Sequence, residues 1–503
     1  MENNKQKVAG SLFWSYGERV MAQLVSLIVS IVLARLLEPD HYGIISIVMI
    51  FITLCDAIVA GGFGNSIIQK RNADELDVNT ILWCSILTSI LLYIIVFITA
   101  PYIAQFYQMA IICPVLRVLG LRLLISGVNS IQRAWIQKRM LFKRFFISTL
   151  FGTLISAIVG IVMAYKGLGV WSLVAQYLVN SFIDTVVLFL TNDWRPKMQF
   201  SWIRAKELLS YGWKVLLTTV VYTIENDIKS LIIGKKFSAA DLAYYDQGKK
   251  FPNLIVTNIN TTIGNVMFPV LSNHQNDLKR VKGVCRRTIR TSTYLLAPLL
   301  IGLIAVAEIF IKGILSEKWT PCIPYLRVLT IIYLVRPLTT TCQQTIMALG
   351  RSDITLKIIV SINIADICLL LIAVLGFESV LLIACGALAA ECLGCCLFMY
   401  YTKKYIGYRY REQLDDIGPS LVLAIIMGIV VNILGKISIN NLLLLIIQII
   451  VGAVFYIGLS VILHFEPLMY LVKMVEERIK SHKVKKIVKK YRNIVGFTNN
   501  YKR

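Results

Sequence analysis

The string PVLRVL at residues 114–119 returns 210 residues later as PYLRVL at residues 324–329. A second pair precedes it in each half: SYGER at residues 15–19 returns as SYGWK at residues 210–214, so a cation closes both strings. These cations interrupt apolar stretches, and a charge inside a bilayer is costly enough that matched positions rarely arise by chance. The repeats therefore predict two related halves of about 200 residues, each contributing one wall of a central polar cavity.

The composition places the chain in a membrane. Of its 503 residues 57% are hydrophobic and the mean hydropathy is +0.70, whereas soluble domains are typically about 45–50% apolar. We expect fourteen spans, because each apolar segment is long enough for about 30 Å of hydrocarbon. The segments are 14–36, 42–63, 79–104, 113–132, 145–165, 168–191, 210–233, 242–268, 291–313, 323–348, 354–376, 378–401, 417–435 and 441–464.

The net charge of +24 is explained by membrane topology. With the N-terminus in the cytoplasm, the segments expected inside carry 36 Lys and Arg residues and the outer loops carry 7. Cytoplasmic loops of membrane proteins carry this excess of positive charge. We therefore expect both termini in the cytoplasm, a retained first helix without signal cleavage, and no nucleic-acid partner.

The expected fold is an all-α integral membrane protein with two parallel repeats. Six crossings separate matching helices, so both copies enter the membrane in the same direction. Residues 1–198 form an N-lobe of helices one to six, and residues 199–412 form a C-lobe of helices seven to twelve. Residues 413–466 add helices thirteen and fourteen, and residues 467–503 form a basic cytoplasmic tail that can begin along the inner leaflet.

Polar side chains recur at helical spacing in several of these segments, so they line one face of each helix. Such faces cannot contact acyl chains, because each central charge costs at least about 2.5–3.5 kcal/mol. The faces comprise Ser15, Arg19, Gln23, Ser26 and Ser30; Lys214, Thr218, Tyr222, Glu225 and Lys229; Lys250, Asn253, Thr257, Thr261 and Asn265; Arg117, Arg122, Ser126 and Asn129; and Arg327, Arg336 and Thr340.

We predict from these faces a cationic substrate cavity. Cations outnumber acids there, and guanidinium and ammonium groups match phosphate oxygens, so the substrate is expected to be anionic. The lining residues are Arg19, Lys214, Lys229, Arg336, Gln23, Ser26, Thr218, Asn253 and Thr257. An alternative that stays open is internal ion pairing or coupling to an ion, for which the acids are Glu18, Glu225, Asp227, Asp56 and Asp366.

The sequence contains no motif typical of an enzyme. A phosphate-binding glycine loop, an HExxH helix and paired carboxylates in an exposed loop are all missing, and no loop is large enough for a catalytic domain. The cluster of Cys392, Cys395 and Cys396 has no companion His or Cys at metal-ligand spacing. We therefore predict a protein that is not an enzyme and needs no metal or cofactor.

Several strings in the first 200 residues resemble the polysaccharide transport family of lipid-linked oligosaccharide flippases. They match its Wzx-like branch of colanic-acid and teichuronic-acid exporters in order and spacing, and the most specific is ARLLEPDHYG at residues 34–43. The others are GGFGNSIIQKR (61–71), APYIAQFY (100–107), PVLRVLG (114–120), QKRMLFKRF (137–145), GLGVWSLVAQ (167–176) and WRP (194–196).

The resemblance implies the flippase fold of the multidrug/oligosaccharidyl-lipid/polysaccharide (MOP) superfamily, with two lobes around a cationic cavity and alternating access. It also implies a polyprenyl-diphosphate-linked oligosaccharide as substrate, moved from the inner to the outer leaflet of the bacterial cytoplasmic (inner) membrane. The pathway would be lipopolysaccharide O-antigen, capsule or exopolysaccharide assembly, with membrane lipids and polysaccharide polymerase or assembly proteins as partners. By analogy Arg19 would meet the diphosphate.

Two other functions compete with that of a flippase. A multidrug/cation antiporter of the same fold would carry cations and should have an acidic cavity, which the positive faces disfavour. A membrane-embedded glycan polymerase or ligase would need a large outer loop, and none is present in the sequence. The glycan, the coupling ion and the oligomeric state are left open by the sequence.

Overall fold

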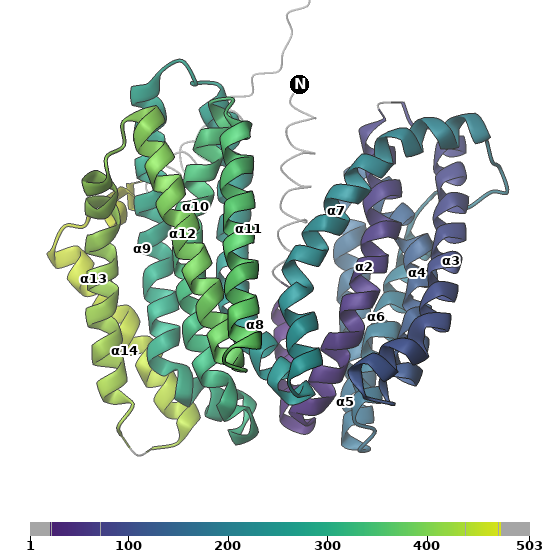
Figure 1. Ribbon diagram of the computed structural model, residues 1–503, viewed down its shortest axis with the longest axis horizontal. Coiled ribbons are helices and arrows are strands. Elements are labelled where there is room, and N and C mark those ends of the chain that lie inside the picture. The colour runs from purple at the N-terminus through teal and green to yellow at the C-terminus, as the bar shows by residue number, and fades with distance from the viewer. Residues whose placement is uncertain (1–20, 22, 71, 438, 471, 474–503) are drawn as a thin grey trace, which may run out of the picture. The chain divides into compact units, whose positions relative to one another are not determined.

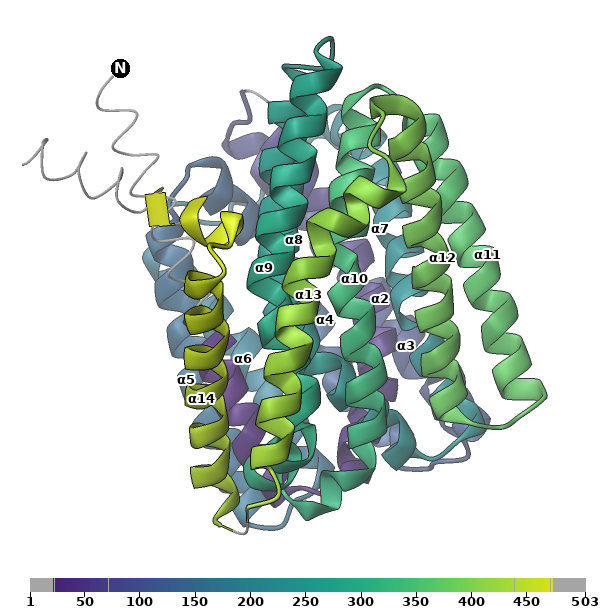
Figure 2. The same cartoon turned by 90° about the vertical axis from the view of Figure 1, so that its left-hand side faces the viewer.

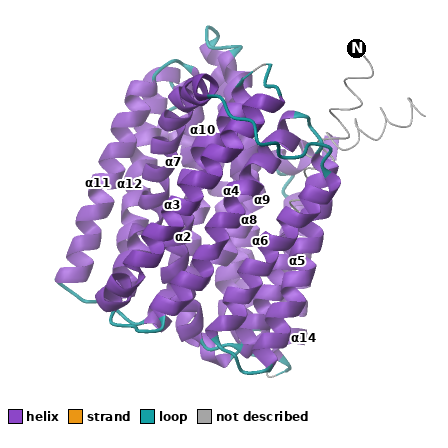
Figure 3. Cartoon of the chain, turned by 90° about the vertical axis from the view of Figure 1, so that its right-hand side faces the viewer, coloured by secondary structure: helices purple, strands orange, loops and turns teal. Residues whose placement is uncertain are grey.

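The computed structural model describes residues 21–473, apart from residues 22, 71, 438 and 471. Within these residues the regular structure is entirely helical, as predicted (Figure 3). A helix at Gln23–Leu36 comes first. The others are α2 (Pro39–Gln69), α3 (Glu75–Tyr107), α4 (Ile112–Lys138), α5 (Phe142–Tyr165), α6 (Val170–Thr191), α7 (Trp202–Lys236), α8 (Ala239–Ser272), α9 (Leu278–Phe310), η1 (Ile311–Leu315), η2 (Glu317–Cys322), α10 (Ile323–Ala348), α11 (Ser352–Leu375), α12 (Val380–Ile406), α13 (Tyr410–Leu434) and α14 (Asn441–Ile462).

Twelve helices in the described part of the chain are long and apolar enough to cross a membrane. Helix α7 is not among them, because its polar residues lower its hydropathy. The described part of the first helix is too short to qualify. The multi-span prediction is therefore confirmed, and the count of fourteen stays a prediction.

The chain folds into two compact units (Figure 1). The first contains the described residues up to 247, together with 314–322 and 374–383. The second contains 248–313, 323–373 and the described residues from 384 onward. The segment 314–322, which contains η2, thus belongs to the first unit although it is far from the rest of that unit in the sequence.

In the first unit, small side chains let α3 and α4 approach closely. The hydroxyl of Ser85 donates a hydrogen bond of 2.8 Å to the backbone oxygen of Gly127. A Cβ added at Gly127 would lie 2.5 Å from the Ser89 hydroxyl oxygen, so a larger residue would require Ser89 to shift. Close packing of small residues is how helices associate where lipid removes the hydrophobic driving force.

The ARLLEPDHYG string forms the turn between the first helix and α2, where distant segments of the first unit meet. Gly43 faces the start of α8, and a Cβ there would overlap the carbonyl group of Ala239. The indole of Trp319, in η2, donates a 2.8 Å hydrogen bond to the oxygen of Ala34 and stacks edge-on against Tyr42. The family-specific string is therefore a packing junction.

In the second unit α9 is the central helix, packed against α10, α13 and α14 (Figure 2). Asp277 caps its first turn by accepting a hydrogen bond from the backbone of Arg280. On α14, the hydroxyl of Tyr456 donates a 3.0 Å bond to the oxygen of Tyr294 on α9. The buried amide of Gln448 donates to the oxygen of Val431 on α13. These bonds attach α14 to the second unit.

Candidate functional site

Three of the residues predicted for the cavity or for coupling cannot be placed by their side chains. Arg19 and Glu18 lie outside the described residues. Lys214 falls within the bounds of α7, but its side chain is outside what the structure describes. The predicted roles of these residues stay predictions.

The first helix and α7 carry the described polar residues of the first unit that were expected in the cavity. Ser26 and Thr218 are exposed, and Gln23 is half-buried. On α7, Glu225 is exposed, whereas Asp227 and Lys229 are half-buried and both engage other groups. The polar face of α7 thus contains both exposed side chains and side chains that interact with other groups.

Helix α8 displays the most regular polar face. Asn253, Thr257 and Thr261 are all exposed and follow one another at four-residue spacing. The Thr257 hydroxyl bonds to Asn253 at both its backbone oxygen, 2.7 Å away, and its side-chain oxygen, 2.8 Å away. These three residues make this part of the face neutral and rich in hydrogen-bonding groups, and Lys250 precedes them on the same helix.

Arg336 on α10 lies beside an acid on α12. Its Nε is 3.9 Å from a carboxylate oxygen of Glu391, and its guanidinium covers the ring of Tyr333 at 4.7 Å. The hydroxyl of Thr339 also donates to Glu391, at 3.2 Å. The Arg336 side chain retains 42% exposure, so this long ion-pair contact does not bury it.

Asp56 on α2 forms an ion pair within the first unit. Its Oδ2 lies 3.3 Å from Arg122 on α4, and both side chains are mostly buried. Of the two interpretations of Asp56, internal pairing or coupling, this geometry favours internal pairing. Asp366 on α11, in the second unit, is half-buried and engages another group.

A second acid cluster in the first unit joins α4 to α6. Asp184 accepts hydrogen bonds from the amide of Asn129 at 2.9 Å and from Arg133 at 2.9 Å. The 210-residue offset of the PxLRVL repeat aligns Asn129 with Thr339, which bonds to Glu391 in the second unit. Each half therefore joins its fourth and sixth predicted helices through an acid, and the repeat offset was the signal that could have revealed it.

Charged side chains also cluster at one end of the first unit. Arg204 on α7 contacts Asp77, whose side chain is fully buried, at 3.0 Å. A hydrogen bond from Arg204 holds the pKa of the Asp74 carboxyl below its usual value. Burial lowers the pKa of the Lys70 ammonium, but hydrogen bonds to Glu207 and Asp77 outweigh burial, so its pKa is raised. The cluster ties the turn between α2 and α3 to α7.

The second unit has a comparable cluster around Asp416 on α13, whose side chain is fully buried. Its carboxylate accepts from Arg286 at 2.7 Å, from Arg290 at 2.6 Å and from the hydroxyl of Tyr408 at 2.6 Å. Burial and the bond to Asp416 raise the pKa of the Tyr408 phenol above its usual value. Nearby Glu412 pairs with a lysine of α9. These ion pairs and hydrogen bonds hold α9 against α13.

The described polar side chains of the candidate site include cations, acids, amides and hydroxyls on several helices. Within the described ranges no three His, Cys, Asp or Glu side chains gather where a metal ion could be held.

A sequence profile of the family described as "Polysaccharide biosynthesis protein" matches residues 32–324, more than half of the chain. The chain belongs to this family. The matched range includes both the ARLLEPDHYG turn and η2, so both sides of that packing junction lie within the family's common region. The resemblance drawn from the sequence motifs is confirmed.

Named proteins that are similar to this chain match different shares of it. The lipopolysaccharide biosynthesis protein WzxC of Escherichia coli (strain K12) is 22% identical over 85% of this chain and 89% of its own length. The teichuronic acid biosynthesis protein TuaB of Bacillus subtilis (strain 168) is 26% identical over 58% of this chain and 61% of its own length. The match thus spans less than two thirds of TuaB.

Two solved structures share the fold of this family member. A lipid II flippase MurJ in an inward closed conformation has a TM-score of 0.72 and 15% identity, covering 90% of this chain and 99% of its own. An inward-facing multidrug resistance transporter of the MATE family has a TM-score of 0.61 and 15% identity, covering 77% and 94%. At these identities the likeness establishes the fold alone.

Proposed function

We propose that this protein is a flippase that moves a polyprenyl-diphosphate-linked oligosaccharide from the inner to the outer leaflet by alternating access. The observation that carries the proposal is that a member of a polysaccharide biosynthesis family has the fold of a lipid II flippase over 90% of its length. In a transporter of this architecture the headgroup of the lipid can cross the membrane between the helices while its prenyl tail stays in the bilayer.

The diphosphate is assigned to the cations of the repeated strings. Arg19 and Lys214 occupy equivalent positions in the two halves, and Lys229 and Arg336 supply further positive charge. Guanidinium groups bind phosphate oxygens through paired donors, and lysine supplies a mobile charge. The 42% exposure of the Arg336 side chain supports its place in this set.

The glycan is assigned to the neutral polar residues. Gln23, Ser26 and Thr218 lie on the first helix and α7, and Asn253 and Thr257 lie on α8. Four of these five side chains are exposed, which supports a role in contacting sugar hydroxyls. Scattered hydrogen bonds of this kind bind sugars while the cations fix the headgroup.

The proposal includes the finer architecture predicted from the sequence. Fourteen spans would form lobes at 1–198 and 199–412, followed by a helix pair at 413–466, with both termini in the cytoplasm. The membrane is the bacterial cytoplasmic membrane, and polysaccharide polymerase or assembly proteins are the proposed partners. Among the acids, Asp366 and the α7 pair Glu225 and Asp227 are proposed for coupling, with Glu18 beside the substrate cation.

The site assignment is tested by complementation of a strain that lacks the gene. Arg19→Ala combined with Lys214→Ala should abolish surface glycan while the amount of protein in the membrane is unchanged. The matched control removes two exposed lysines, Lys166→Ala with Lys436→Ala, and should restore normal glycan. Surface polysaccharide and membrane-inserted protein are both measured in each strain.

The outcomes separate the site from the function. Normal glycan from the Arg19 and Lys214 double variant would contradict the cavity assignment. Loss of glycan in both the double variant and the control would indicate a general need for positive charge. If the strain without the gene itself makes normal glycan and becomes sensitive to cationic drugs, the flippase proposal fails and an antiporter is indicated.

A further inference from the structure

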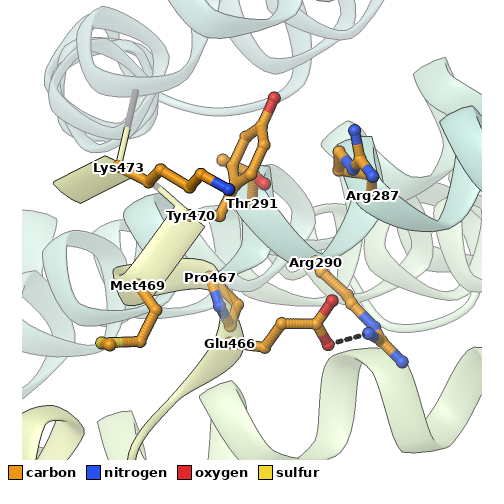
Figure 4. A pocket seen from close by; sticks show the side chains of 8 residues that line it. All are labelled: Arg287, Arg290, Thr291, Glu466, Pro467, Met469, Tyr470 and Lys473. Atoms are coloured by element: carbon orange, nitrogen blue, oxygen red, sulfur yellow. Dashed lines mark hydrogen bonds and ion pairs between the residues drawn. The ribbon is translucent and has the colours of Figure 1, made fainter. Parts of the chain in front are cut away.

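A cleft lies in the second unit where the chain continues past α14. It has a volume of about 260 Å³ and lies between α9 and the segment 466–473 (Figure 4). Its lining residues are Arg287, Arg290, Thr291, Glu466, Pro467, Met469, Tyr470 and Lys473. The cleft belongs to a different set of residues from the proposed substrate cavity.

The charge of the cleft is not balanced by its own acid. Glu466 contacts Arg290, and Arg290 and Arg286 both pair with the buried Asp416, so these two arginines and two acids neutralise one another. Arg287 stacks on the ring of Tyr470 at 5.1 Å. Within the described part of the chain, no carboxylate lies within ion-pair distance of Arg287 or Lys473. Among the described lining residues, Arg287 and Lys473 are thus the cations without a carboxylate partner.

The rest of the lining is suited to an amphiphile. Pro467, Met469 and the ring of Tyr470 supply apolar surface, and the hydroxyl of Thr291 supplies a hydrogen-bond donor. On the same segment the side chains of Met469 and Val472 are 55% and 45% exposed. Exposed apolar groups beside cations without a carboxylate partner are typical of a surface that meets the headgroup region of a bilayer.

The position of the cleft agrees with that chemistry. Helix α14 is a candidate span that ends at Ile462, only four residues before the cleft segment begins at Glu466. If α14 leaves the hydrocarbon core at Ile462, the residues that follow lie in the headgroup region of the bilayer. The positive-inside distribution places this end of α14 on the cytoplasmic side, where the leaflet is rich in anionic lipids.

We propose that the cleft between α9 and the segment 466–473 binds the phosphate headgroup of an anionic phospholipid. Arg287 and Lys473 hold the phosphate, Thr291 donates to it, and the acyl chains leave past Met469 and Val472. The bound lipid anchors the segment after α14 against α9. This site is a lipid site in addition to the proposed substrate cavity, and its occupation does not depend on transport.

Binding is tested on the purified full chain in detergent, using short-chain phosphatidylglycerol, phosphatidylcholine with the same chains, and inorganic phosphate. Native mass spectrometry counts bound lipid, and the thermal unfolding midpoint reports stabilisation by ligand. We expect phosphatidylglycerol to bind at least tenfold more tightly than the other two probes. Arg287→Gln with Lys473→Gln should reduce its affinity at least tenfold.

Two further variants separate a built site from general attraction. Lys279→Gln with Arg280→Gln removes the same charge from exposed positions of α9 that do not line the cleft, and should change affinity less than twofold. Arg287→Gln with Lys473→Arg should bind more tightly than the Arg287→Gln, Lys473→Gln variant. Equal losses in the cleft and control variants, or equal affinity for both lipids, would overturn the proposal. Inorganic phosphate that matches phosphatidylglycerol would overturn it in favour of a free-anion site.

Discussion

Replacing Asp416 by asparagine should loosen the packing of α9 against α13 in the second unit. Asp416 accepts hydrogen bonds from Arg286, Arg290 and Tyr408, at distances of 2.6–2.7 Å, and its side chain is fully buried. Asparagine has nearly the same volume but no charge. Its amide nitrogen is a hydrogen-bond donor and would face the guanidinium groups, which are also donors. The change therefore leaves two arginines without their shared counter-ion.

The magnitude follows from that loss. Removing one partner of a buried ion pair typically costs about 3–5 kcal/mol, because the remaining charge stays desolvated. The arginines are only partly buried, with 31% and 28% of their side chains exposed, so water compensates some of the loss. We therefore expect a decrease of about 2–4 kcal/mol in the free energy of unfolding.

The assay is equilibrium unfolding of purified protein in mixed micelles, followed by the fluorescence of a thiol-reactive dye at the newly exposed cysteines. The control is Asp415→Asn, which removes the neighbouring exposed acid and should change stability by less than about 0.5 kcal/mol. If Asp416→Asn and Asp415→Asn have the same effect, the buried cluster does not stabilise the fold and the reasoning is refuted.

Two further predictions concern the first unit. Trp319→Phe should cost about 1–3 kcal/mol, measured by the same unfolding assay, because the oxygen of Ala34 loses its buried indole donor. Asp74→Asn should make the free energy of unfolding depend less on pH in the acid range. The pKa of the Asp74 carboxyl is lowered in the folded protein, because Arg204 donates a hydrogen bond to it. This bond therefore stabilises the protein above the usual carboxyl pKa of about 3.9, and the stabilisation is lost as the pH falls through the folded pKa.

Each of these two variants has its own control. Trp202→Phe changes an indole that is 80% exposed and should be neutral within about 0.5 kcal/mol. Equal effects of the two tryptophan changes would contradict the junction at Ala34. For Asp74, stability is measured from about pH 7 down to pH 3, and a variant profile parallel to that of the unsubstituted protein would contradict the contribution of the bond from Arg204.

The helical class and the positions of most of the helices were predictable because lipid admits few backbone solutions. A segment in hydrocarbon must satisfy its own hydrogen bonds, so an apolar run of about 20 residues predicts a helix. Hydropathy failed at the helix ends. The apolar run 291–313 lies largely inside the longer α9, which begins at Leu278, because charged turns can continue a helix beyond the bilayer.

The pairing of charges could not be predicted, because it depends on contacts between residues far apart in sequence. Arg286 and Arg290 count as positive-inside charge in the sequence, yet they bind Asp416, about 130 residues away. The partner of the ARLLEPDHYG turn is also far away in the sequence and could not be predicted. The string itself identified the family, but nothing in it indicates that Trp319 packs against the turn.

The candidate site was predicted from helical spacing, the repeated cations and the family resemblance. Spacing identifies a face of a helix without its surroundings. On α8, Asn253 and Thr257 are exposed at the four-residue spacing that places them on one face. Spacing does not distinguish an open acid from a paired one, and Asp56 is held by Arg122. The internal repeat contained more information, since its offset relates Asn129 to Thr339, each bonded to an acid.

The central claim is that this chain moves a lipid-linked oligosaccharide across the membrane, and the sidedness of that lipid tests it most directly. The protein is depleted in its host, and membranes are probed from each side with an enzyme that cleaves or labels the glycan. The account predicts that complete lipid-linked units accumulate on the cytoplasmic side while surface glycan disappears. Complete units that still reach the outer side at the normal rate after depletion would contradict it.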